Sequence, residues 1–141
     1  MSTFVLGTDG SRAAEAAVEK VIELVRVSGV TVHLVCAYPG RSTLERLGMS
    51  ARQEPVDLRG VAADVVARAE LMFREAGFAV EKHAREGDPA QTIIDVADEQ
   101  NAELIVIGAR GTTGLRRFML GSVAAKLSHH APSSLLIVRD D

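Results

Sequence analysis

Five short runs that predict strands alternate along this chain with four stretches whose apolar residues recur at helical spacing; four of the runs are apolar, and the one at residues 78–85 alternates weakly and suits an edge strand. The runs cover residues 3–6, 30–38, 78–85, 104–107 and 135–138, and the helical stretches cover residues 13–25, 61–76, 89–100 and 122–130. Such alternation is typical of a parallel sheet with helices on both faces. The sequence therefore predicts a Rossmann-like α/β fold with one open five-stranded sheet. A length of 141 residues predicts a single domain, residues 1–141.

The helical stretches carry recognisable start signals. Asp88 precedes Pro89 and can cap the third helix, and Gln91 can complete a capping box. In the second helix, apolar spacing predicts a buried face made by Val61, Val65, Ala69, Met72, Phe73 and Ala76. Residues 39–60 contain Pro and Gly at intervals and predict a long surface loop, with a short helical turn at residues 43–47.

The fourth apolar run leads into a loop, residues 107–123, that is punctuated by glycine. Glycine lets the backbone turn tightly and approach a ligand closely. A helix predicted to begin near Gly121 and Ser122 would point unpaired N–H groups and a positive dipole end at that ligand. The loop therefore has the properties of a phosphate-binding loop.

Two common phosphate-binding motifs are absent from the sequence. The chain has no Gly-Lys pair, which the P-loop requires, and Arg110 stands where the dinucleotide fingerprint needs its second glycine. No nucleophile elbow, HExxH motif or other catalytic spacing is found either. We therefore expect a protein that is not an enzyme, with at most slow hydrolysis of a bound nucleotide.

Composition excludes several other classes. A net charge of −3 and 4% aromatic residues disfavour nucleic acid as a partner. No apolar stretch approaches 18 residues, so we expect no membrane association and a cytoplasmic location. Cys36 is the single cysteine and is predicted to be a small buried residue, and His33 is predicted to be a satisfied or edge histidine rather than a metal ligand.

The glycine loop fits a different pattern without gaps. Gly108, two residues, Gly111, nine residues, then Gly121-Ser122 resembles the G-2x-G-9x-G-[ST] motif of nucleotide-binding universal stress proteins. The resemblance covers the whole chain, from VLGTDGSRAA at residues 5–14 to the segment NAELIVIG at residues 101–108. The family often has a second proline before the last strand, where this chain has Ser133 and Ser134.

The resemblance implies a sheet order of 3-2-1-4-5 and an ATP site at the ends of the first and fourth strands. Asp9 would bond the ribose hydroxyls, and Ala37 would line the adenine pocket. The other implied site residues lie beside the base, the ribose or the phosphates, and they are Gly7, Thr8, Ile107, Gly108, Arg110, Gly111, Gly121, Ser122 and Val123. A Mg²⁺ or Mn²⁺ ion would be held mainly by the phosphates, with no dedicated metal site.

Three functions remain open at this point. The first is an ATP-binding stress or regulatory protein with an unknown protein partner, the second is a slow ATPase that uses the same pocket, and the third is a nucleotide-free dimeric interaction protein. Asp9 has a simpler role open to it, as a helix cap alone. Family resemblance also implies a homodimer through the last strand, from Leu135 to Val138, which would cover an apolar sheet edge.

Overall fold

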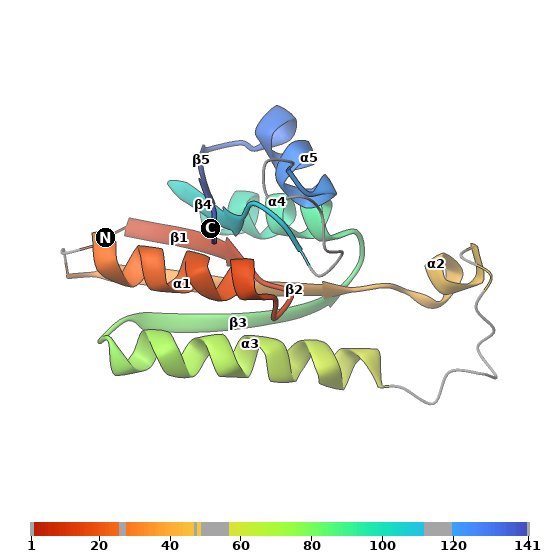
Figure 1. Ribbon diagram of the computed structural model, residues 1–141, viewed down its shortest axis with the longest axis horizontal. Coiled ribbons are helices and arrows are strands. Elements are labelled where there is room, and N and C mark those ends of the chain that lie inside the picture. The colour runs from red at the N-terminus through yellow and green to blue at the C-terminus, as the bar shows by residue number, and fades with distance from the viewer. Residues whose placement is uncertain (1, 26–27, 47, 49–56, 112–119, 141) are drawn as a thin grey trace.

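The computed structural model describes residues 2–25, 28–46, 48, 57–111 and 120–140. They contain a five-stranded parallel sheet in the order β3-β2-β1-β4-β5 (Figure 1). Its strands are β1 (Ser2–Gly7), β2 (Val30–Tyr38), β3 (Ala79–Glu86), β4 (Leu104–Gly108) and β5 (Ser134–Val138). The predicted fold class is thus confirmed, as is the strand order implied by the family resemblance.

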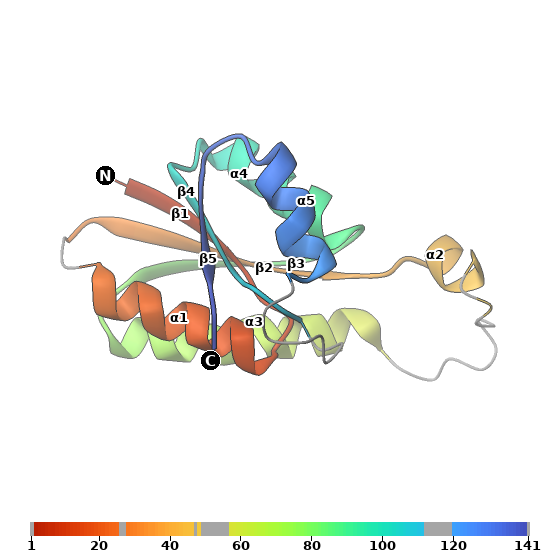
Figure 2. The same cartoon turned by 45° about the horizontal axis from the view of Figure 1, so that its top comes forward.

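Helices cover both faces of the sheet, as Figure 2 shows. On one face lie α1 (Arg12–Leu24) and α3 (Leu58–Glu75), and on the other lie α4 (Pro89–Gln100) and α5 (Ser122–His130). Side chains alternate across the central strand, so that Leu6 packs with the α1 and α3 side and Val5 with the α4 and α5 side. Burying one such side chain contributes about 1.5–3 kcal/mol.

Part of the predicted surface loop at residues 39–60 is helical. Its N-terminal part forms α2 (Arg41–Arg46), close to the turn predicted at residues 43–47, and α3 begins at Leu58 within the predicted loop. Residues 47 and 49–56 of the predicted loop lie outside the described part of the chain.

Three helices begin with a side-chain cap. The side chains of Ser11, Asp57 and Asp88 accept hydrogen bonds from backbone N–H groups in the first turns of α1, α3 and α4. The capping box predicted at Gln91 does not form, because its side-chain amide donates instead to Asp95 Oδ1 at 2.8 Å, one helical turn further on. The Asp88 carboxylate alone therefore caps α4. Its hydrogen bond from the Gln91 N–H is the main cause that lowers the pKa of Asp88.

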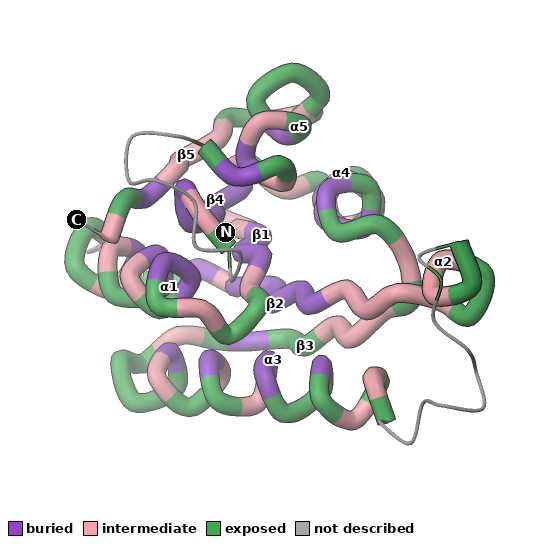
Figure 3. The backbone as a smooth tube through the Cα atoms, turned by 45° about the vertical axis from the view of Figure 1, so that its right-hand side comes forward, coloured by how far each residue is buried: buried purple, intermediate pink, exposed green. Residues whose placement is uncertain are grey.

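The buried face of α3 differs from the prediction at its two ends. Val65, Ala69 and Phe73 are buried as expected, but Val61 is 52% exposed and Ala76 lies beyond the helix in an exposed turn. Ala62 and Val66 take the inward positions instead, so the buried stripe is rotated relative to the one predicted (Figure 3).

The β2–β3 edge of the sheet holds a histidine pair, in which His33 is buried and His83 is half-buried. His33 is 2% exposed, and its Nδ1 lies 2.9 Å from His83 Nε2 and 3.3 Å from Glu81 Oε2. Arg85, which pairs with Glu99 on α4 through two 2.7 Å contacts, approaches the other nitrogen of His83. His33 is thus satisfied by a second histidine, in agreement with the prediction.

Burial also settles the state of Cys36. Its side chain is packed in the core against the α1 and α3 side of the sheet. Burial, followed by the charge of Asp9, raises the pKa of the thiol to about 11, so the thiol stays protonated at neutral pH.

Within the described residues, no helix combines the length and the apolar character that crossing a membrane requires.

We predict that acidification destabilises the fold through the histidine pair. Burial is the main cause that lowers the pKa of both His33 and His83, so the folded protein binds protons less readily than the unfolded chain. Their contribution is complete above the ordinary histidine pKa of about 6.5 and is lost as the pH falls below it. Thermal unfolding midpoints measured from pH 7.5 to 5 should therefore fall.

The variant His83→Gln keeps a hydrogen-bonding group beside His33 and removes one titratable group. Its thermal unfolding midpoint should therefore fall less steeply as the pH is lowered. The matched control is His129→Gln, at the exposed end of α5. An equal dependence of the unfolding midpoint on pH for wild type and His83→Gln would contradict the assignment of the acid destabilisation to the histidine pair.

Candidate functional site

The carboxyl ends of β1 and β4 lie side by side. The two strands pair in parallel, with Phe4 opposite Leu104 and Leu6 opposite Val106. β1 continues through α1 to β2 on one side, whereas β4 lies on its other side, so the direction of strand order reverses between them. Open parallel sheets bind ligands at this point.

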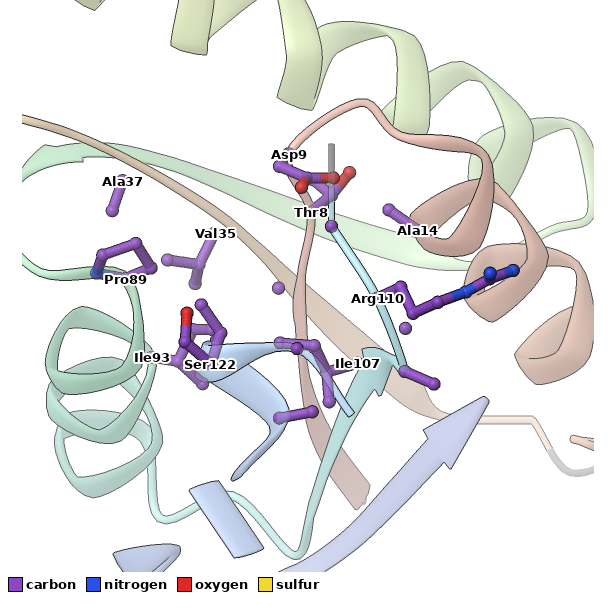
Figure 4. A pocket seen from close by; sticks show the side chains of 17 residues that line it. Thr8, Asp9, Ala14, Val35, Ala37, Pro89, Ile93, Ile107, Arg110 and Ser122 are labelled. Atoms are coloured by element: carbon purple, nitrogen blue, oxygen red, sulfur yellow. The ribbon is translucent and has the colours of Figure 1, made fainter. Parts of the chain in front are cut away.

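A pocket with a volume of about 170 Å³ lies at these strand ends (Figure 4). This is several times the share of one water molecule in the liquid, about 30 Å³. The structure brings together at this pocket every site residue that the family resemblance implied, namely Gly7, Thr8, Asp9, Ala37, Ile107, Gly108, Arg110, Gly111, Gly121, Ser122 and Val123.

Six further lining residues were not foreseen, and they are Ala14, Val35, Pro89, Ile93, Ala109 and Ala124. In the sequence they are ordinary apolar residues of helices, strands and a helix start. Only Pro89 carried a signal, as the predicted first residue of its helix. The others line the pocket because the sheet brings α1, β2, α4 and α5 together around the end of β4.

One wall of the pocket is apolar. Val35 of β2, Ile93 of α4 and Ile107 of β4 are buried and line it, with half-buried Ala37 beside them. A small apolar wall with a few polar groups opposite is the usual construction of a small-molecule site.

Asp9 supplies a carboxylate at the opposite side of the pocket. Its Oδ1 accepts from the Ser11 N–H at 2.9 Å, which holds the turn after β1. Ser11, rather than Asp9, is the N-cap of α1, because its Oγ accepts from the Ala14 N–H. The second oxygen, Oδ2, lies against Gly111, where an added Cβ would come within 2.8 Å.

The start of α5 forms the third part of the pocket. Gly121 is its N-cap and provides no side-chain hydrogen bond, in contrast to the caps of α1, α3 and α4. The Gly121 N–H donates to the Ala109 carbonyl at 2.7 Å, which returns the chain to the end of β4. The first-turn N–H groups of a helix have no partner within the helix, so Ser122 and Val123 present donors and a positive dipole end at the pocket.

Arg110 lines the pocket, but its guanidinium does not extend into it. The side chain points away from Asp9 and Ser122 in Figure 4 and forms an ion pair with Asp140, just beyond β5. Hydrogen bonding from Arg110 is the main cause that lowers the pKa of Asp140. Arg110 therefore lines the pocket, whereas its guanidinium is paired with Asp140.

The middle of the glycine loop, residues 112–119, lies outside the described part of the chain. Within the described residues, no group of three His, Cys, Asp or Glu side chains is arranged to hold a metal ion.

Comparison with known proteins identifies the family. The sequence matches the universal stress protein family over residues 1–139. A universal stress protein from Synechocystis is 31% identical over 138 residues, which cover 96% of this chain and 84% of that relative. The chain belongs to the universal stress protein family. A universal stress protein from Mycobacterium tuberculosis is 29% identical over 139 residues, which cover 96% of this chain and 94% of that protein.

Solved structures agree with this assignment. The hypothetical protein MJ0577 shares the fold, with a TM-score of 0.82 over 97% of this chain and 94% of its own, at 22% identity. The universal stress protein from Archaeoglobus fulgidus has a TM-score of 0.75 at 27% identity, covering 99% and 94%. Its structure in complex with dAMP has a TM-score of 0.73 at 26% identity, covering 99% and 98%.

We predict that two glycines of the motif tolerate a methyl group very differently. A Cβ on Gly108 would lie 2.8 Å from the backbone carbonyl carbon and oxygen of Ala13, whereas a Cβ on Gly121 would meet its neighbours at 3.5 Å, an ordinary contact. Gly108→Ala should therefore lower the free energy of unfolding by about 1–3 kcal/mol, the usual cost of overpacking.

Gly121→Ala is the matched control and should lower the free energy of unfolding by less than about 1 kcal/mol, because the added methyl group meets no clash and only replaces glycine by alanine at the N-cap of α5. Urea denaturation measures both. Equal losses for the two variants would mean that the approach of β4 to α1 does not require glycine at position 108.

Proposed function

We propose that this universal stress protein binds an adenine nucleotide, with ATP as its ligand, and acts as a nucleotide-dependent regulatory protein in the stress response. The observation that carries the proposal is the facing arrangement of Asp9 and the uncapped start of α5 across a pocket with an apolar wall. These three features match the three parts of a nucleotide: the base, the sugar and the phosphates.

Each part of the ligand has a suitable surface. The adenine would lie against Val35, Ile93 and Ile107, which are buried and apolar. The Asp9 carboxylate would accept hydrogen bonds from the ribose hydroxyls through Oδ2, because Oδ1 is already bonded to the Ser11 N–H. The phosphates would accept hydrogen bonds from the first-turn N–H groups of α5, a general anion-binding arrangement.

The related Archaeoglobus fulgidus protein supports an adenine nucleotide as the ligand class, since its structure was solved in complex with dAMP. We extend this to ATP because the first turn of α5 leaves several N–H groups without a partner in the helix, enough for more than one phosphate group. Mg²⁺ or Mn²⁺ would bind with ATP and be held mainly by phosphate oxygens and water, as is usual for Mg²⁺.

We further propose little or no turnover. Among the described lining residues, Asp9 is the one carboxylate and there is no histidine, so few groups could orient an attacking water. The nucleotide would then act as a signal that a regulatory protein partner reads. The protein would work in the cytoplasm as a homodimer through β5, whose outer edge is unpaired within the described sheet.

The test of this proposal is direct titration with Mg-ATP, after any co-purified nucleotide has been removed. A ligand at 100 times its Kd stabilises the folded state by about 2.7 kcal/mol, so saturating ATP should raise the unfolding midpoint by several degrees. Absence of binding to any adenine nucleotide would instead favour a nucleotide-free interaction protein. Release of ADP at about one per second or faster would favour an ATPase.

We expect Asp9→Asn to weaken ATP binding about 10-fold or more. The amide keeps an acceptor for the Ser11 N–H but places a donor where the ribose hydroxyls need an acceptor, and hydrogen bonds to charged groups contribute about 1.5–3 kcal/mol. Asp98→Asn, an exposed carboxylate on α4 outside the pocket, is the matched control. Isothermal titration calorimetry measures both. An unchanged Kd for Asp9→Asn would remove the ribose from the proposed contacts of Asp9.

We also expect the Asp140 carboxylate to weaken the binding of the outer phosphates of ATP, because it competes with them for the Arg110 guanidinium. Asp140→Asn should strengthen ATP binding by about 3- to 10-fold, equivalent to about 1 kcal/mol, and should change AMP binding less. In the background of Arg110→Ala the effect of Asp140→Asn should disappear. An equal gain in affinity for ATP and AMP would contradict this competition.

A further inference from the structure

The outer face of α3 carries large apolar side chains that the fold leaves in solvent. In the described residues four large hydrophobic side chains are exposed, and two of them, Val61 at 52% and Leu71 at 62%, lie on this helix. The inner face of α3 packs on the sheet, and the opposite face looks outward along the whole helix (Figure 3). Val61 and Leu71 therefore need an explanation other than the core of this chain.

Val61, Asp64, Arg68 and Leu71 form a continuous stripe, here named the outer seam of α3. Their spacing of three, four and three residues places them on one side of a helix. They line one shallow hollow together with Ala67, whose small side chain permits close approach of another helix. The same spacing is that of the a and d positions where two helices pack along a coiled-coil seam.

Asp64 and Arg68 make no ion pair, hydrogen bond or ring contact within the described part of the chain. Asp64 lies on the same side of the helix as the two exposed apolar residues, and Arg68 lies between that side and the turn after β1, where its Nη2 is close to Gly10. A partner that covers this stripe must offer a positive charge to Asp64, a negative charge to Arg68 and apolar groups to the residues at either end. Otherwise a charge would be left unpaired.

The outer seam is complementary to itself. Val61 and Leu71 each lie five positions from Val66, on opposite sides, and Asp64 and Arg68 each lie two positions from it. A two-fold axis on the outer face of α3, at the level of Val66 along the helix, would bring a second α3 alongside in antiparallel orientation. Val61 would then pack on Leu71 of the second copy, and Asp64 would pair with Arg68 of the second copy, each contact occurring twice.

We propose that the outer seam of α3 is an isologous docking surface for a second copy of this chain. The pairing of each charge with its opposite and of each apolar residue with another favours a copy over an unrelated partner. The proposal does not rest on nucleotide binding. The outer seam also lies on the side of the molecule away from β5, so pairing through α3 and pairing through β5 can coexist (Figure 1).

The contact would be weak and dependent on concentration. The next position of the stripe in each direction is acidic, Asp57 at one end and Glu75 at the other, and the two-fold axis would set them against each other. The complementary part is therefore limited to the four residues of the outer seam. Interfaces of this small size belong to weak or transient associations, so we expect a Kd between about 1 μM and 1 mM.

Charge reversal tests the pairing. Asp64→Arg gives two arginines on the outer seam, and Arg68→Asp gives two aspartates, so each variant alone should repel its own copies. Mixed together, the two variants should associate, because every arginine then faces an aspartate. Sedimentation velocity over a concentration series up to about 1 mM should show a lower weight-average mass for each variant alone than for wild type, and recovery of the wild-type mass in the equimolar mixture.

The gain on mixing cannot arise from a variant that fails to fold, and the double variant Asp64→Arg/Arg68→Asp should also regain the wild-type mass. Asp98→Arg on α4 is the matched control for adding an arginine to an exposed helix, and it should leave the mass unchanged. The proposal is overturned if Asp64→Arg sediments as wild type at every concentration, or if the mixture stays at the mass of the separate variants.

Discussion

The pairing of β1 with β4 is the constraint on which the rest of the molecule depends. It places the Gly7–Asp9 turn and the glycine loop at one end of the sheet, although about a hundred residues separate them in the chain. The close approach of Gly108 to the backbone of Ala13 then brings α1 against the end of β4. The hydrogen bond from Gly121 to Ala109 returns the loop to the same place.

One side of the pocket has backbone donors to offer because α5 begins without a side-chain cap. The described starts of α1, α3 and α4 satisfy first-turn donors with Ser11, Asp57 and Asp88. At α5 the cap is Gly121, so the first-turn donors and the dipole remain available to a ligand. Where the other helices gain about 1 kcal/mol from a cap, α5 keeps an electropositive end, which is the property that nucleotide binding would use.

Cationic side chains near the pocket are paired with carboxylates from other parts of the fold. Arg110 stands at the pocket but is paired with Asp140, and Lys126 in the middle of α5 is paired with Asp88 at the start of α4. Buried groups away from the pocket are instead satisfied by each other, as His33 is by His83. The outer seam of α3 is different, because its two charges have no counterpart within the described chain and match each other across a two-fold axis.

The sequence by itself determined the elements and the family. Apolar runs, helix start signals such as Asp88-Pro89, and the glycine spacing from Gly108 to Ser122 are local patterns, and local patterns report backbone conformation directly. Only the tertiary structure decided which way side chains point when several partners compete for them. It turned Arg110 toward Asp140, joined His33 to His83, gave the inward positions of α3 to Ala62 and Val66, and left Val61 outside. These outcomes depend on contacts between segments far apart in the chain, which periodicity within one segment does not encode.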